Sequence, residues 1–291
     1  MRKRSHRLRA VAAVAVAAVL GLAGCDASGG GAPSSRPSPK PVWNRSPDSI
    51  AAVGDSITRG FDACTVLSDC PQVSWATGTD TGVDSLAVRL LGPAGATERS
   101  WNYAVTGARM ADLAGQIAQA VRHRPELVTV MVGANDACRS STSAMTPVGD
   151  FREQFEDAMA VLRRSLPKAQ VYVSSVPNLM RLWSEGRTSA LGKQVWKLGI
   201  CPSMLGDADA LDAASTRRRA AVQSRVEAYN QVLKEVCAKD RRCRFDGNAV
   251  FDYRFGPAQL SPWDWFHPST NGQARLAEIA YRTVTAKDPV T

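Results

Sequence analysis

Residues 127–132 read LVTVMV, a nearly continuous apolar run that ends at Gly133. Runs of this kind predict a strand buried on both faces, as in a parallel sheet covered by helices. Shorter runs at Ile50–Val53, Asn102–Val105 and Val171–Val176 predict three more strands, and Ala249–Phe251 is a candidate for a fifth.

Segments with a helical pattern lie between these runs, near residues 83–91, 111–122, 150–165, 213–236 and 270–284. Alternating strands and helices indicate βαβ units. We therefore expect one α/β domain, a three-layer α/β/α sandwich around a central, mostly parallel sheet. Residues 178–212 interrupt the alternation, and the length of this connection indicates a functional or partly helical segment.

The first 24 residues have the pattern of a signal peptide. Basic residues between Arg2 and Arg9 precede an apolar stretch at Ala10–Gly21 that is too short to span a bilayer comfortably. Leu22-Ala23-Gly24-Cys25 resembles the lipobox of bacterial lipoproteins, in which the Cys is lipidated and becomes the N-terminus. The alternative is ordinary signal cleavage nearby, with Cys25 lost or free.

Residues 25–47 are dominated by Gly, Ser, Pro and basic residues, with Trp43 as the only large apolar side chain. Such a segment buries too little surface to offset its ordering entropy, so we expect a disordered tether. The folded domain then spans residues 48–291. The expected location is extracytoplasmic, as a lipoprotein anchored to the cell membrane through Cys25 or as a secreted protein.

Net charge gives little support for a nucleic-acid partner. The whole chain carries +9, but without residues 1–24 it has 31 basic against 27 acidic residues, a net charge of +4. No basic helix with interleaved aromatic residues is present. We therefore expect no nucleic-acid binding. We also expect the protein to be a monomer.

Six cysteines remain when Cys25 is set aside, and an even number in an exported chain predicts disulfides. They are Cys64, Cys70, Cys138, Cys201, Cys237 and Cys243. Six cysteines allow 15 pairings, so the sequence does not decide among them. Local spacing favours Cys64–Cys70 and Cys237–Cys243, which leaves Cys138–Cys201. Because there is no C-x2-C pair, we expect no metal site.

Candidate catalytic residues stand at the ends of the predicted strands. Ser56 follows the strand at Ile50–Val53, where ligands bind in open parallel sheets. A Ser hydroxyl needs a base, and His267, with Asp264 three residues before it, supplies the pattern of a catalytic triad. The alternative for Asp55 and Ser56, and for Asp264 and His267, is a helix cap.

Two further residues fit an oxyanion hole. Gly107 follows the strand near Asn102–Val105, and Asn135 follows the apolar run at 127–132. A backbone amide and a side-chain amide at such positions can donate to a developing oxyanion. The alternatives are a turn glycine for Gly107 and an Asx-turn for Asn135.

The order of these motifs resembles the SGNH/GDSL hydrolase superfamily, which is named for its Ser, Gly, Asn and His. Gly54-Asp55-Ser56, Gly107, Gly133-Ala134-Asn135-Asp136 and Asp264-Trp265-Phe266-His267 occur in the family's order within residues 49–285. The resemblance implies a flavodoxin-like SGNH hydrolase fold and three sequential disulfides, as in secreted actinobacterial esterases and lipases. Ile57 replaces the Leu of the GDSL name.

The resemblance also implies a role for each matching residue. Ser56 is expected to be the nucleophile, His267 the base, and Asp264 the group that orients it, although some members use a main-chain carbonyl instead. The Ser56 and Gly107 amides and the Asn135 side chain are expected to form the oxyanion hole. The expected function is ester hydrolysis through an acyl-enzyme, with no cofactor.

The substrate is expected to be a lipid ester or another carboxylic ester. Trp183, Trp196 and the segment 178–212 are candidates for an acyl pocket, and the alternative for the aromatic residues is a place in the core. A polysaccharide O-deacetylase and an acyltransferase are alternatives that use the same site. A non-catalytic surface binding lipoprotein is the alternative of a different class.

Overall fold

We describe residues 43–288 of a computed structural model of the protein. The signal peptide and lipidated Cys25 predicted above lie outside these residues. Of the helices in the described part of the chain, none combines the length and the apolar character that a membrane crossing requires.

A five-stranded parallel sheet, in the order β2-β1-β3-β4-β5, forms the centre of the domain. The strands are β1 (Ile50–Gly54), β2 (Ser100–Asn102), β3 (Leu127–Met131), β4 (Gln170–Val173) and β5 (Cys243–Phe245). Every residue of β1, β3 and β4 is buried, which explains why their sequences are apolar without alternation.

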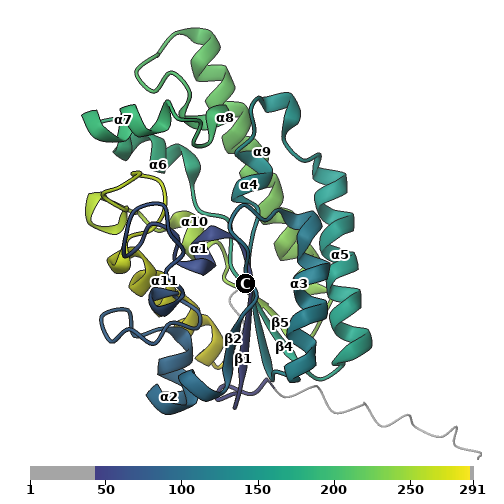
Figure 1. Ribbon diagram of the computed structural model, residues 1–291. Coiled ribbons are helices and arrows are strands. Elements are labelled where there is room, and N and C mark those ends of the chain that lie inside the picture. Colours follow the sequence, from purple (N-terminus) through teal and green to yellow (C-terminus); the bar gives the residue numbers. More distant parts are fainter. Residues whose placement is uncertain (1–42, 289–291) are drawn as a thin grey trace, which may run out of the picture. The chain divides into compact units, whose positions relative to one another are not determined.

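Helices cover both faces of the sheet and complete the three layers that the sequence predicts (Figure 1). On one side lie α3 (Leu113–Ala120), α5 (Val148–Ser165) and α9 (Ala213–Ala238), and on the other lie α2 (Leu86–Glu98) and α11 (Thr270–Thr285). The short helices are α1 (Ser56–Arg59), α4 (Ala134–Ala137), α6 (Leu179–Gly186), α7 (Ala190–Trp196), α8 (Pro202–Leu205) and α10 (Ala249–Asp252). The α/β/α fold class is therefore confirmed.

Two predicted strands are placed differently in the structure. The second strand is Ser100–Asn102 instead of Asn102–Val105, and the Asn102 side chain donates to the Thr58 carbonyl and accepts from the Ala104 amide. The chain stays beside β1 after this strand, because the Tyr103 and Val105 amides donate to the Ala52 and Gly54 carbonyls.

The prediction of a strand at Ala249–Phe251 is wrong, because these residues lie in α10. The Asp246 carboxylate accepts from the Asn248 and Val250 amides and starts a helical turn directly after β5. The fifth strand is Cys243–Phe245, a segment too short and too polar to stand out in the sequence.

The expected boundary of the tether at residue 47 also needs correction. Trp43 is half-buried, its Nε1 donates to the Val284 carbonyl at 2.8 Å, and the Arg244 guanidinium lies over its ring. Asn44 is hydrogen-bonded to Gln170. Residues 43–47 are therefore part of the folded unit, because the one large apolar side chain of the segment finds a partner in the C-terminal helix.

Three disulfides join Cys64 to Cys70, Cys138 to Cys201, and Cys237 to Cys243. These are the pairings that local spacing favours. Cys138–Cys201 ties the end of α4 to the start of α8, so it fastens the segment between β4 and α9 to the rest of the domain. That segment contains α6, α7 and α8, and it lies beyond the carboxyl ends of the strands (Figure 1).

Candidate active site

Three side chains from distant parts of the sequence meet beyond the carboxyl end of β1. The Ser56 Oγ lies 2.8 Å from Nε2 of His267, and Nδ1 of His267 lies 2.5 Å from Oδ2 of Asp264. Their exposed fractions are only 5%, 9% and 1%. This arrangement can pass a proton from the hydroxyl to the imidazole while the carboxylate holds the imidazole in one tautomer.

The turn before Ser56 depends on a glycine. Gly54 has a φ of 150°, and a Cβ at this position would lie 2.1 Å from the Met131 carbonyl oxygen. Asp55 then caps α1, because its Oδ1 accepts from the Ile57 amide at 3.0 Å. Asp55 therefore fills the capping role, and the Ser56 hydroxyl faces His267.

Two buried glutamines fix the end of β1. Gln116 accepts from the Gly54 amide at 2.7 Å and donates to the Gly54 carbonyl at 2.9 Å. Gln273, on α11, accepts from the Trp75 amide and donates to the Ile57 carbonyl, each at 2.9 Å. Sequence reasoning missed both residues, since a lone Gln in a helical pattern gives no signal of a buried role.

Asp264 is held by its own turn. Its Oδ1 accepts from the Phe266 and His267 amides, and its carbonyl accepts from Trp196 Nε1 at 2.8 Å. Burial alone would raise the pKa of the Asp264 carboxyl, but hydrogen bonds from the His267 ring and these amides outweigh burial and lower it. The carboxylate is therefore ionised and able to stabilise an imidazolium.

Asn135 and the Gly107 segment lie side by side. The Asn135 Nδ2 donates to the Ala108 carbonyl at 3.0 Å, and Gly107 has a φ of 84°. A primary amide has two N–H donors, so one remains for a ligand. Asp136 holds the same region, because it accepts from the Met110 amide at 2.9 Å and the Thr146 hydroxyl at 2.7 Å. The oxyanion roles of Ser56, Gly107 and Asn135 remain predictions.

Asp62 was not singled out in the sequence, yet it lies against the Asp264–His267 pair. One side-chain ligand atom from each of Asp62, Asp264 and His267 lies within 4.8 Å of the other two, the one cluster of this kind among residues 43–288. Both nitrogens of the His267 ring already contact Ser56 or Asp264, so a metal ion would have to break one of these contacts.

A small apolar cavity of about 20 Å³ adjoins the triad. Its walls include Ile57, Ala134, Phe266 and Pro268, which are chain neighbours of Ser56, Asn135 and His267. The remaining lining residues are Pro177, Asn178, Leu179, Leu182, Phe255 and Leu260. An apolar recess beside a nucleophile can receive the acyl or alcohol part of an ester.

Neither Trp183 nor Trp196 lines this cavity, contrary to the expectation from the sequence. Trp196 is 3% exposed and supports Asp264 through its indole N–H. Trp183 donates to the Ala208 carbonyl, and the guanidinium groups of Arg187 and Arg219 lie over its ring. Both are packing residues of the segment between β4 and α9, and α6 contributes leucines to the cavity instead.

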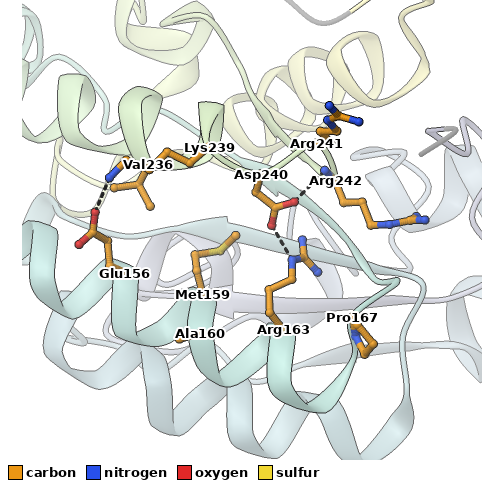
Figure 2. Close-up of a pocket in the computed structure, with 10 residues that line it drawn as sticks. All are labelled: Glu156, Met159, Ala160, Arg163, Pro167, Val236, Lys239, Asp240, Arg241 and Arg242. Atoms are coloured by element: carbon orange, nitrogen blue, oxygen red, sulfur yellow. Dashed lines mark hydrogen bonds and ion pairs between the residues drawn. The ribbon is translucent and has the colours of Figure 1, made fainter. Parts of the chain in front are cut away.

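A larger cavity of about 620 Å³ lies elsewhere, between α5 and the connection from α9 to β5 (Figure 2). Four of its charged residues form two ion pairs, Lys239 with Glu156 at 2.8 Å and Arg163 with Asp240 at 2.5 Å. Pro167 and Arg242 in its lining precede β4 and β5, so it lies toward the amino ends of the strands. Size alone therefore does not identify the reactive site.

An α/β/α domain with Ser, His and Asp joined by hydrogen bonds at the carboxyl edge of its sheet has the architecture of a serine hydrolase. The chain belongs to the GDSL-like Lipase/Acylhydrolase family, whose sequence model matches residues 50–280. Membership of this family supports the interpretation that the chain is an ester hydrolase.

One relative is the mouse (Mus musculus) protein "Phospholipase B1, membrane-associated", which is 26% identical over 198 residues, or 55% of this chain. The chain spans only 13% of the length of that relative.

Solved structures share the fold at low identity. Axe2, an acetylxylan esterase from Geobacillus stearothermophilus solved as a catalytic mutant, has a TM-score of 0.50 and 17% identity, covering 84% of this chain and 96% of its own. SsfX3, a salicylyl-acyltransferase from a tetracycline biosynthetic pathway, has a TM-score of 0.50 and 18% identity, covering 84% of this chain and 57% of its own. At these identities the likeness describes the fold alone.

Proposed function

We propose that the protein is an exported serine hydrolase that cleaves carboxylic esters through an acyl-enzyme on Ser56. The observation that carries the proposal is the unbroken contact path from the Ser56 hydroxyl through His267 to Asp264. A Ser hydroxyl is a weak nucleophile until such a base takes its proton.

The reaction has two steps with balanced proton transfers. His267 takes the Ser56 proton as the Ser56 oxygen attacks the ester carbonyl, and the imidazolium then protonates the departing alcohol. Water attacks the acyl-enzyme and gives a proton to His267, which returns this proton to the Ser56 oxygen as the acid is released. The Ser56 and Gly107 amides and the free N–H of Asn135 are the proposed donors to the oxyanion.

The acyl group is proposed to enter the cavity formed by α6 and the turns around His267. With a volume of about 20 Å³, this cavity is so narrow that even a short acyl group requires its lining side chains to move, and a longer chain requires a larger displacement of Leu182 or Leu260. Short-chain esters, including acetyl esters, are therefore the proposed preferred substrates, and long-chain lipid esters are the alternative for the same site.

Export is proposed from the disulfides, because such bridges form and persist in oxidising compartments. A lipid anchor on Cys25, a monomeric state and the absence of a nucleic-acid partner remain predictions from the sequence.

Replacing Ser56 with Ala tests the nucleophile. We expect hydrolysis of p-nitrophenyl acetate to fall by at least about 10³-fold, because the remaining groups cannot form an acyl-enzyme. The exposed Ser143 provides the matched control, and Ser143→Ala should hydrolyse the ester at the wild-type rate.

Covalent labelling of Ser56 by a fluorophosphonate should be lost in the same variant. Hydrolysis by Ser56→Ala at the wild-type rate would refute the proposal. Transfer of the acyl group to added alcohols in preference to water would identify an acyltransferase instead.

A further inference from the structure

A second carboxyl group, that of Asp62, lies beside the carboxylate of Asp264. Asp62 is 1% exposed, and one of its carboxylate oxygens lies within 4.8 Å of both a carboxylate oxygen of Asp264 and a ring nitrogen of His267. Two buried carboxyl groups this close together interact strongly with each other and with the imidazole.

The loop that carries Asp62 is held firmly against the turn of Asp264. The Asp62 amide donates to the Ser68 carbonyl at 3.0 Å, and the Asp62 Oδ1 accepts from the Leu67 amide. The Ser261 hydroxyl donates to the Asp62 carbonyl at 2.7 Å, and the Cys64–Cys70 bridge closes the loop. These contacts fix the carboxyl group beside Asp264 and prevent it from turning toward solvent.

We propose that Asp62 is a positioning residue that sets the basicity of His267 through the Asp264 carboxylate. The proposal rests on the proposed function, in which His267 is the base. Ionised Asp62 adds a second negative charge beside the imidazole and stabilises the imidazolium that forms when the Ser56 proton moves to Nε2. No proton moves to Asp62 in the reaction, and it does not contact the substrate.

The pKa of Asp62 depends on burial and on a few neighbouring groups. Burial, followed by the neighbouring Asp264 carboxyl, raises the pKa of Asp62 to about 6, and the Leu67 amide and His267 oppose this shift. Asp55, at the start of α1, also interacts electrostatically with His267. Asp69, in the same loop, is paired with Arg59 and one-third exposed. Asp62 is therefore neutral in acid and charged above neutral pH.

Asp62→Asn tests the proposal, because an amide reproduces the neutral form at every pH and keeps an acceptor for the Leu67 amide. We expect kcat for p-nitrophenyl acetate above pH 7 to fall about 3- to 10-fold with KM unchanged. The midpoint of the acid limb of the kcat/KM profile should move to lower pH by about one unit.

Asp84→Asn is the matched control. Asp84 has a similar left-handed backbone conformation, with a φ of 49° against 55° for Asp62, but its carboxyl group is half-exposed and paired with Arg89. This variant should leave both the rate and the midpoint unchanged. A residue with only a structural role at position 62 would lower thermal stability or kcat without moving the midpoint.

A second readout does not depend on turnover. The low-field NMR resonance of the proton between Asp264 and His267 should titrate at lower pH in Asp62→Asn than in wild type. An unchanged NMR midpoint would overturn the inference, whatever the esterase assay shows. A shifted midpoint in a protein without esterase activity would support the coupling and count against the proposed function alone.

The wild-type protein provides a measurement that needs no folded variant. Because a proton on Asp62 weakens proton binding at His267, and the reverse, the acid limb of kcat/KM should be broader than a single ionisation gives. A limb that fits one ionisation across pH 4–8 would count against the role of Asp62.

Discussion

At the scale of single residues, the site combines buried carboxyl groups with different charge states. Asp264 is kept ionised by three hydrogen bonds, from the Phe266 and His267 amides and the His267 ring, whereas Asp62 and Asp55 are held nearer to neutrality by burial. Groups with perturbed pKa values that gather around one nucleophile are typical of active sites. The residues that sequence reasoning selected thus depend on neighbours that it did not select.

Asp55 leads to a prediction about stability. Burial raises the pKa of Asp55 from 3.8 to about 7, against the Ile57 amide and His267. A raised carboxyl pKa stabilises the fold at low pH, and this contribution is lost as pH rises through about 7. Asp55→Asn, which keeps the cap on α1, should therefore lose less stability than wild type on going from pH 4 to pH 8.

The expected difference is at most about 4 kcal/mol in the free energy of unfolding, measured by urea titration at several pH values. The half-exposed Asp84 offers a comparison, because Asp84→Asn should follow the wild-type pH dependence. If the difference between wild type and Asp55→Asn were independent of pH, Asp55 would not be the titrating group.

At the scale of elements, α6 is the helix of the segment between β4 and α9 that lines the apolar cavity, whereas α7 reaches the site through Trp196. Leu179 and Leu182, one helical turn apart on its inner face, are buried in the wall of the apolar cavity. The helix begins at Asn178, whose side chain accepts from the Arg181 amide at 2.8 Å. The cavity, and with it the proposed preference for short acyl groups, depends on the position of this helix.

Leu182→Ala should enlarge the cavity and shift the preference toward longer acyl chains. We expect the ratio of kcat/KM for p-nitrophenyl octanoate to that for the acetate to rise about tenfold or more, because the removed side chain occupies the path of a longer chain. Leu191 on α7 is 59% exposed and outside the cavity, so Leu191→Ala should leave the ratio unchanged. An unchanged ratio in Leu182→Ala would show that the acyl group binds elsewhere.

At the scale of the whole molecule, the disulfides hold segments that the sheet does not reach. Cys138 ends α4, which bears Asn135, and Cys201 precedes α8. The Cys138–Cys201 bridge therefore connects α4, which follows β3, to the segment that contains α6. Cys237–Cys243 closes only the short turn between α9 and β5.

Removal of the two bridges should have unequal effects. The double substitution Cys138→Ala and Cys201→Ala should lower the free energy of unfolding by about 4 kcal/mol, because the bridge closes a loop with a sequence separation of 63. Cys237→Ala with Cys243→Ala, which opens a separation of 6, should cost about 2 kcal/mol. Equal losses in urea titrations would contradict an account based on loop entropy.

The sequence alone determined the layered α/β architecture, because buried parallel strands require apolar runs and amphipathic helices repeat at their own period. It also indicated Ser56, which follows a predicted strand and Gly54-Asp55, and the pair Asp264 and His267, which are three residues apart. A strand as short as Cys243–Phe245 has too few residues for a periodic signal. The apolar residues Ala249–Phe251 resemble a strand in the sequence, although the turn at Asp246 makes them helical.

Only the tertiary structure decided which side chains meet. Asp62 lies beside Asp264, and Leu182 lines the same cavity as Ile57, because loops from separate strands converge at one edge of the sheet. The charge state of Asp62 and the size of the cavity depend on distances between segments far apart in the chain. Local sequence patterns carry no information about such distances, whereas burial and Coulomb interactions depend on them directly.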